Sequence, residues 1–213
     1  MTSPHTPKST LTGPAAGLLF LAAFALSSPP PGVSAGGAAV VTFYRAHSTT
    51  QHLSDACWML GLALLVLFTG ALRTRLRGVP AAEGLATNAL AGAAITAAGG
   101  CVYFGCDFAL AGMPASMAPA AAQAVNLLAL QLVLPLGAGV LVLGIAAGLA
   151  ILRSGLLPAW TGWTAIVLGF TGLAGPFALV AFGLWAAVVG ILASRPQARV
   201  SSDAAPHQAQ ADA

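Results

Sequence analysis

The residues best suited to chemistry in this sequence are two histidines and two aspartates, His47, His52, Asp55 and Asp107. His52 and Asp55 are three residues apart, so they share one face of a helix. With His47 and Asp107 they could converge on a metal ion or form an acid–base pair. The spacing matches no established ligand motif, and residues solvated at a membrane surface would give the same pattern. We therefore favour solvated surface residues, keep this His/Asp cluster as a candidate, and predict no catalytic, cofactor-binding or metal-binding residue.

Other chemical signatures are missing or weak. The sequence contains no Walker loop, dinucleotide-binding glycine fingerprint, zincin motif or serine nucleophile elbow. Three cysteines, Cys57, Cys101 and Cys106, are too few and too dispersed for a zinc site or a disulfide framework. A disulfide between Cys57 and Cys106 is an alternative to free thiols, which are the commoner state in membrane helices.

The composition indicates whether water or lipid surrounds this chain. Only 6% of the residues are charged and 58% are apolar, and the mean hydropathy is +0.87. A soluble domain carries roughly a quarter charged residues, so this chain must be covered largely by lipid. The net charge of +3 comes from arginines at helix ends and not from a basic stripe, which excludes a nucleic-acid partner. Membrane lipids are the expected partners, and a protein partner and the oligomeric state are left open.

Apolar stretches long enough to cross a membrane, about 20 residues each, divide the chain into an all-α bundle with about six spans. The expected spans cover residues 11–28, 53–72, 85–108, 127–152, 159–173 and 176–193. A short amphipathic helix over 38–47 is expected to lie in the membrane interface. Residues 1–10 and 195–213 are expected to be disordered cytoplasmic tails.

Two segments have features that a simple span would not have. Residues 119–153 contain no strong terminator, and about 35 residues at about 1.5 Å each would exceed any bilayer core. We expect the first turns to protrude or the helix to bend at Pro135. The nearly apolar turn at 172–176 predicts that the fifth and sixth spans form an antiparallel hairpin.

The basic residues predict the orientation. With the N-terminus inside, seven of the eight basic residues lie on the cytoplasmic side, namely Lys8, Arg73, Arg75, Arg77, Arg153, Arg195 and Arg199. Arg45 alone lies outside. The positive-inside rule therefore favours both termini in the cytoplasm of a bacterium, with the chain in its plasma membrane. A cleavable signal peptide ending at Ala35 is the alternative for the first span, but its cut site would lie far beyond the apolar core.

No charged residue lies in the middle of an expected span, which weighs against an ion-coupled transporter. A path for a small solute would have to be lined by polar residues, of which the candidates are Asn88, Thr96, Asn126 and Gln131. The patterns Gly13-x-x-x-Gly17 and Gly144-x-x-x-Gly148 favour close helix packing within the bundle over dimerisation.

One segment resembles a known group of proteins. Residues 153–163 read Arg-Ser-Gly-Leu-Leu-Pro-Ala-Trp-Thr-Gly-Trp, and residues 41–47 read Val-Thr-Phe-Tyr-Arg-Ala-His. This combination resembles small multi-pass membrane proteins frequent in actinobacteria, whose domain has no assigned function. The resemblance favours retention of the first helix and implies no activity and no site residues.

The leading hypothesis is therefore a non-enzymatic membrane protein that binds a partner, a lipid or a small apolar ligand. A small-solute transporter is the first alternative. A metal-dependent membrane enzyme that uses the His/Asp cluster is the second.

Overall fold

A computed structural model describes residues 11–113 and 116–194, and over these residues it contains helices and no strand. The helices are α1 (Thr12–Leu26), α2 (Gly37–Leu76), α3 (Pro80–Gly112), α4 (Pro119–Gln131), α5 (Val133–Ser154), α6 (Ala159–Phe170), the short 3₁₀ helix η2 (Thr171–Ala174) and α7 (Pro176–Ser194). The predicted all-α class is confirmed. The tails predicted for 1–10 and 195–213 lie outside the described residues.

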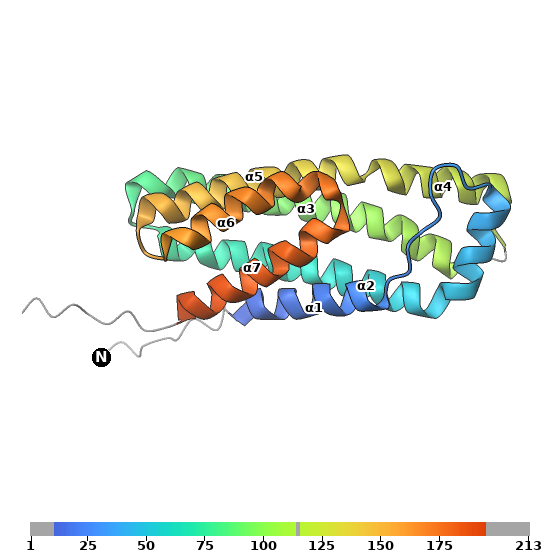
Figure 1. Ribbon diagram of the computed structural model, residues 1–213, viewed down its shortest axis with the longest axis horizontal. Helices are drawn as coiled ribbons and strands as arrows, with labels where there is room; N and C mark the ends of the chain where they lie inside the picture. Colours follow the sequence, from blue (N-terminus) through green and yellow to red (C-terminus); the bar gives the residue numbers. More distant parts are fainter. Residues whose placement is uncertain (1–10, 114–115, 195–213) are drawn as a thin grey trace, which may run out of the picture.

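The helices form an elongated bundle in which α2, α3 and α5 run side by side over most of its length (Figure 1). Helix α3 packs against both α2 and α5, α1 packs against α2 and α7, and α6 lies along α5. The start of α1 and the end of α7 lie at the same end of the bundle (Figure 1). We call this the terminal end, and the end where α2 begins the loop end.

Four helical segments are long and apolar enough to cross a membrane, namely Gly37–Leu76, Pro80–Gly112, Pro119–Ser154 and Phe177–Ser194. Helices α1 and α6 are apolar but have 15 and 12 residues, which is about 22 and 18 Å at about 1.5 Å per residue. Large apolar side chains such as Leu18, Leu60 and Val167 are exposed on the bundle surface. An apolar exterior of this kind is suited to acyl chains and not to water.

Helix α2 joins two segments that the sequence analysis separated. Residues 38–47 and 53–72 are parts of one continuous helix of 40 residues, whose first turns cross the loop end at a steep angle to the rest (Figure 1). The linking residues 48–52 contain no glycine or proline, and two of their side chains bond to carbonyls of α2 itself. The Thr50 hydroxyl lies 3.1 Å from the His47 carbonyl oxygen, and His52 Nδ1 lies 2.9 Å from that of Ser48. The helix therefore has no reason to end there.

The long apolar stretch after residue 119 is interrupted, as expected. Helix α4 ends at Gln131 and α5 begins at Val133. Pro135 has no backbone N–H and its ring crowds the carbonyl four residues earlier, so the break at Leu132 lies one turn before the proline.

Helices α6 and α7 are joined by η2 and Gly175, whose φ of +73° is in the region that favours glycine. The two helices diverge from this turn, α6 toward α5 and α7 toward α1 (Figure 1). The indole N–H of Trp185, midway along α7, donates at 2.9 Å to the carbonyl of Thr161, near the start of α6. The hairpin is therefore an open one that spans the bundle.

Glycines allow the helices to approach closely. A Cβ at Gly13 or Gly17 would lie 2.4 or 2.7 Å from a backbone oxygen of α7, and one at Gly148 would lie 2.5 Å from the carbonyl oxygen of Gly162 in α6. Gly144 faces the Gly169 backbone in the same way. Both small-residue patterns are thus used for packing within the bundle, as predicted.

The α3–α5 contact offers a matched test of this packing. A Cβ at Gly92 would lie 2.4 Å from the Leu143 backbone nitrogen, whereas one at Gly105 in the same helix would meet nothing within 4 Å. Gly92→Ala should lower the stability to unfolding by about 1–3 kcal/mol because two backbones must separate. Gly105→Ala should change it by less than about 1 kcal/mol. Unfolding by SDS titration measures both, and equal effects would contradict the close approach.

Candidate functional site

Two buried carboxyl groups lie inside the loop half of the bundle. Asp107, near the end of α3, is 3% exposed and accepts a hydrogen bond of 2.8 Å from the Tyr44 hydroxyl on its Oδ1. Asp55 of α2 is fully buried, and its charge is close enough to interact with that of Asp107. We had expected both carboxyl groups to be solvated surface groups, and this expectation is wrong. The bend that brings the start of α2 across the bundle closes Tyr44 over α3 and removes water from both groups.

The polar groups around Asp55 are only partly satisfied. Gln51, one turn earlier, donates from Nε2 to Asp55 Oδ1 over 3.5 Å, a long hydrogen bond. Asp55 Oδ2 and Gln51 Oε1 are buried and have no hydrogen-bond partner among the described residues. Most buried polar groups in folded proteins are paired, and in lipid the cost of leaving them unpaired is higher still. Two unpaired acceptors one helical turn apart therefore indicate a functional site or a site that lacks its hydrogen-bond donors.

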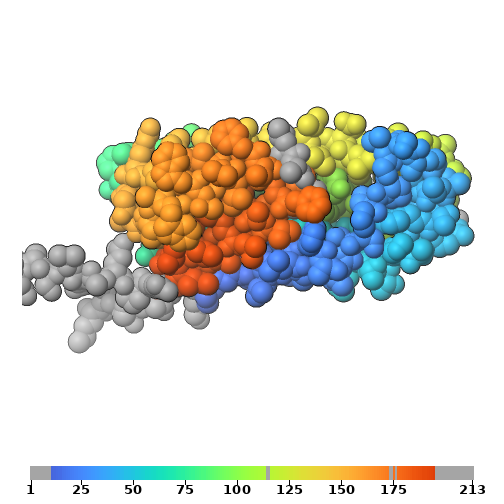
Figure 2. Space-filling model, viewed as in Figure 1, coloured from blue at the N-terminus to red at the C-terminus, as the bar shows by residue number. Residues whose placement is uncertain are grey.

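Two of these polar residues, Gln51 and Asp107, line a cavity of about 440 Å³. Helices α1, α2, α3 and α7 and the segment after α1 form its walls, through Phe24, Ser27, Ser28, Pro29, Pro30, Gln51, Trp58, Tyr103, Phe104, Asp107 and Phe177. In Figure 2 the opening lies between the orange start of α7 and the blue segment that follows α1, with green α3 behind them. The volume is within the range of pockets that hold small organic ligands.

Five of the eleven residues that line the cavity are aromatic. The Trp58 indole stacks on the Phe104 ring with centroids 5.0 Å apart and planes inclined by 5°. Tyr103 meets Phe104 edge to face at 4.9 Å, and Phe24 meets Phe177 at 5.6 Å. Rings held against one another in this way cannot easily turn to fill the space, so the cavity is a fixed feature of the fold.

The segment that follows α1 covers the cavity and is held by a hydrogen bond from α4. The Asn126 side chain of α4 donates from Nδ2 to the Pro31 carbonyl at 3.0 Å. The last turn of α1, where the segment begins, is held by α2, because the Ser54 hydroxyl donates to the Ala23 carbonyl at 2.9 Å. Pro29, Pro30 and Pro31 lack N–H donors and have restricted φ angles. This segment can therefore pass across the cavity without leaving buried N–H groups unpaired.

The structure divides the His/Asp cluster. Nδ1 of His47 and of His52 each faces a carbonyl oxygen one turn back, of Phe43 and Ser48. Their rings pack on Phe43 and on Phe108, at 4.6 and 4.4 Å. Only the two aspartates come together. Within the described ranges no three His, Cys, Asp or Glu side chains are placed to hold a metal ion, and the three cysteines are free thiols.

The four residues proposed for a solute path are also separated. Asn88 and Gln131 are exposed on the bundle surface. Thr96 is fully buried and donates to the Gly92 carbonyl in its own helix, and Asn126 is occupied with Pro31. None of the four lines the cavity. They form no continuous path through the described bundle.

The polar and aromatic residues of α2 at and behind the cavity were not predicted, although their spacing indicates one helix face. Tyr44, Gln51, Asp55 and Trp58 are separated by seven, four and three residues, which places them on one face of a single helix. Dividing α2 into two helices concealed this pattern. Tyr103 and Asp107 are four residues apart and share a face of α3 in the same way.

No protein-family model, curated protein sequence or solved structure matches this chain. The resemblance to actinobacterial membrane proteins remains a prediction.

Two buried tyrosines, Tyr44 beside Asp107 and Tyr103 at the cavity, test how much the Tyr44–Asp107 hydrogen bond stabilises the bundle. Tyr44→Phe removes the donor to Asp107 and should reduce the stability of the bundle by about 1–2 kcal/mol. Tyr103→Phe is the control, because the Tyr103 hydroxyl makes no hydrogen bond with the described residues, and it should change stability by less than about 0.5 kcal/mol. SDS unfolding curves of the two variants should differ in this order, and the reverse order would show that the Tyr44–Asp107 contact contributes nothing.

Proposed function

We propose that this protein is a multi-pass protein of the bacterial plasma membrane that binds a small organic molecule in the cavity beneath residues 27–30. The observation that carries this proposal is the pair of unpartnered buried acceptors, Asp55 Oδ2 and Gln51 Oε1, beside a cavity of about 440 Å³. A packed membrane bundle gains nothing from such a void, because each missing contact weakens it. A ligand would fill the space and bring the missing donors.

Binding without catalysis agrees best with the groups that reach the cavity. The histidine rings pack elsewhere, so the ionisable side chains that line or adjoin the cavity are carboxyl and phenol groups. General acid–base or nucleophilic catalysis needs a nucleophile and a base in hydrogen-bond reach of each other. The Tyr44–Asp107 pair is the nearest approach to this arrangement, and its hydroxyl is already engaged away from the cavity wall.

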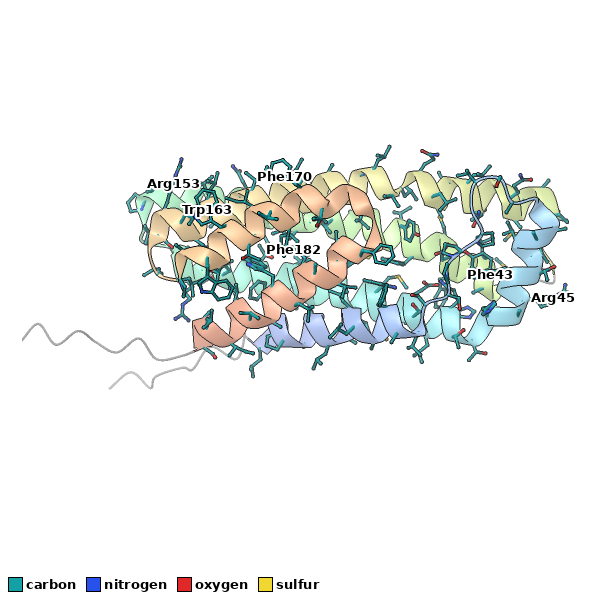
Figure 3. The ribbon with its side chains drawn as sticks, viewed as in Figure 1. Phe43, Arg45, Arg153, Trp163, Phe170 and Phe182 are labelled. Carbon is teal, nitrogen blue, oxygen red and sulfur yellow. The ribbon has the colours of Figure 1, made fainter. Side chains whose placement is uncertain are left out.

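The distribution of arginines supports an orientation with the terminal end in the cytoplasm. Arg73 donates to Thr87 and Arg75 donates to the Ala193 carbonyl, which ties the end of α2 to the start of α3 and the end of α7. Arg153 lies at this end too, together with Trp163, whereas Arg45 lies at the opposite end (Figure 3). In the proposed in/in topology the cavity faces the outer leaflet and the exterior.

A filled-cavity variant tests the binding function. The neutral probe 2-phenylethanol should change the tryptophan fluorescence in a saturable way in phosphatidylcholine nanodiscs. In this background the exposed Trp160 and Trp163 are replaced by Phe, which leaves Trp58 at the cavity and the buried Trp185 as the emitting residues. Ser28→Phe should abolish saturation because the new ring occupies the cavity.

The matched control is Ser34→Phe, in the same segment but exposed and outside the cavity wall, which should bind like the parent protein. A response that is unsaturable, or identical in all three proteins, would show partition into lipid only and would overturn the proposed function.

Reporter fusions test the orientation. A phosphatase that is active only outside the cytoplasm should be inactive when fused after Arg77 or after Arg153, and active when inserted at Ser34. Activity after either arginine would reverse the proposed topology.

A further inference from the structure

We infer that the cavity selects an organic cation, an amine or ammonium group carried on an aromatic or other apolar body. This inference rests on the proposed binding function and adds the chemical class of the ligand. It follows from three independent features of the cavity, which are its acceptors, its charge and its rings.

The acceptors at the cavity outnumber the donors. Asp55 Oδ2 and Gln51 Oε1 are unpartnered, and Asp107 lines the cavity with a single hydrogen bond, the one that its Oδ1 accepts from Tyr44. Of the donors at the wall, Gln51 Nε2 is directed to Asp55 Oδ1 and the Ser27 hydroxyl to the Phe24 carbonyl, which leaves the hydroxyls of Ser28 and Tyr103. A ligand that brings several N–H donors suits this excess of acceptors, and an ammonium group has up to three.

The charge at the site is also uncompensated. In the described part of the chain neither Asp55 nor Asp107 forms an ion pair with a lysine, arginine or histidine. Two carboxyl groups close together in a dry interior repel each other when charged, and each lacks hydration. A cationic group bound at Asp107, the carboxyl group that lines the cavity, would reduce both costs. An anionic ligand would add to them, and a neutral ligand would leave the repulsion in place.

The rings identify the cation as organic. Trp58, Phe104 and Tyr103 present aromatic surface at the cavity, and a cation within about 6 Å of such a ring is attracted by its quadrupole. A bare metal ion would use only oxygen ligands and would leave most of the 440 Å³ empty. An ammonium group attached to an apolar body uses the oxygens, the rings and the volume together.

The test compares three probes of similar size that differ in charge, which are phenethylamine, 2-phenylethanol and phenylacetate. Each is titrated against the full-length protein in phosphatidylcholine nanodiscs, with the change in total tryptophan fluorescence as the readout. The amine should bind at least about tenfold more tightly than the alcohol, as expected for charge-assisted hydrogen bonds, and phenylacetate should bind more weakly than either. This comparison needs no variant, so it does not depend on how well a mutated protein folds.

Variants then assign the preference to the two carboxyl groups. Asp107→Asn and Asp55→Asn should lose most of the preference for the amine and still bind 2-phenylethanol. Glu83→Gln removes an exposed carboxylate at the other end of α3 and should leave all three affinities unchanged.

Equal affinities for amine and alcohol would overturn the cation inference and leave the binding function standing. Failure of all three probes to bind would overturn both. Displacement of the amine by Na⁺ or Mg²⁺ at comparable concentration would assign the site to an inorganic cation and would also overturn the inference.

Discussion

Close approach of helix backbones is the constraint on which the bundle depends, and α3 shows it most clearly. Over its first two thirds the buried positions are small, for example Ala89, Gly92 and Ala93, and the backbone of α5 lies directly against them. Lipid gives no hydrophobic driving force for helix association, so such contacts must come from dispersion at short range. At Tyr103 and Phe104 the same buried face becomes aromatic. Both rings line the cavity, whose other walls come from α1, α2, α7 and the segment after α1.

The hydrogen bonding of the buried polar side chains also differs between the part of the bundle packed on the small residues of α3 and the part near its aromatic residues. A polar side chain buried in a membrane bundle needs a partner because lipid supplies none. In the tightly packed half, Thr96 and Thr69 solve this locally by donating to carbonyls one turn back in their own helices. In the loop half, Asp55 and Gln51 cannot do so completely, since carboxylate and amide oxygens are acceptors and the helix offers them no free N–H. Asp55 Oδ2 and Gln51 Oε1 are therefore left without a hydrogen-bond partner among the described residues.

Much of the architecture was predictable from composition and spacing, and the site was not. Apolar length predicted the helices, the small-x-x-x-small patterns predicted their contacts, and Pro135 predicted the interruption between α4 and α5, because each depends on local chemistry alone. The site depends on whether residues 48–52 continue the helix and on which face of α2 then turns inward. A hydropathy window records Gln51 and His52 alike as polar. Their surroundings in the fold differ, because Gln51 lines the cavity, whereas His52 packs on the Phe108 ring.

The bend of α2 and the segment after α1 together explain why the cavity of about 440 Å³ lies toward the loop end. Helix α1 is too short to reach that end, and its chain continues as the proline-containing segment that Asn126 holds against α4. Helix α7 also begins well inside the bundle, at the same level as the end of α1, as the Phe24–Phe177 contact shows. Two short helices thus leave the faces of α2 and α3 uncovered beyond this level. The start of α2 covers α3 there with Tyr44, and residues 27–30 form the remaining wall. A wall made of a fastened loop and not of a helix is the part of the bundle that can open at the lowest cost, because few backbone hydrogen bonds must break. A ligand would therefore enter and leave beneath residues 27–30, while the glycine-packed half remains closed.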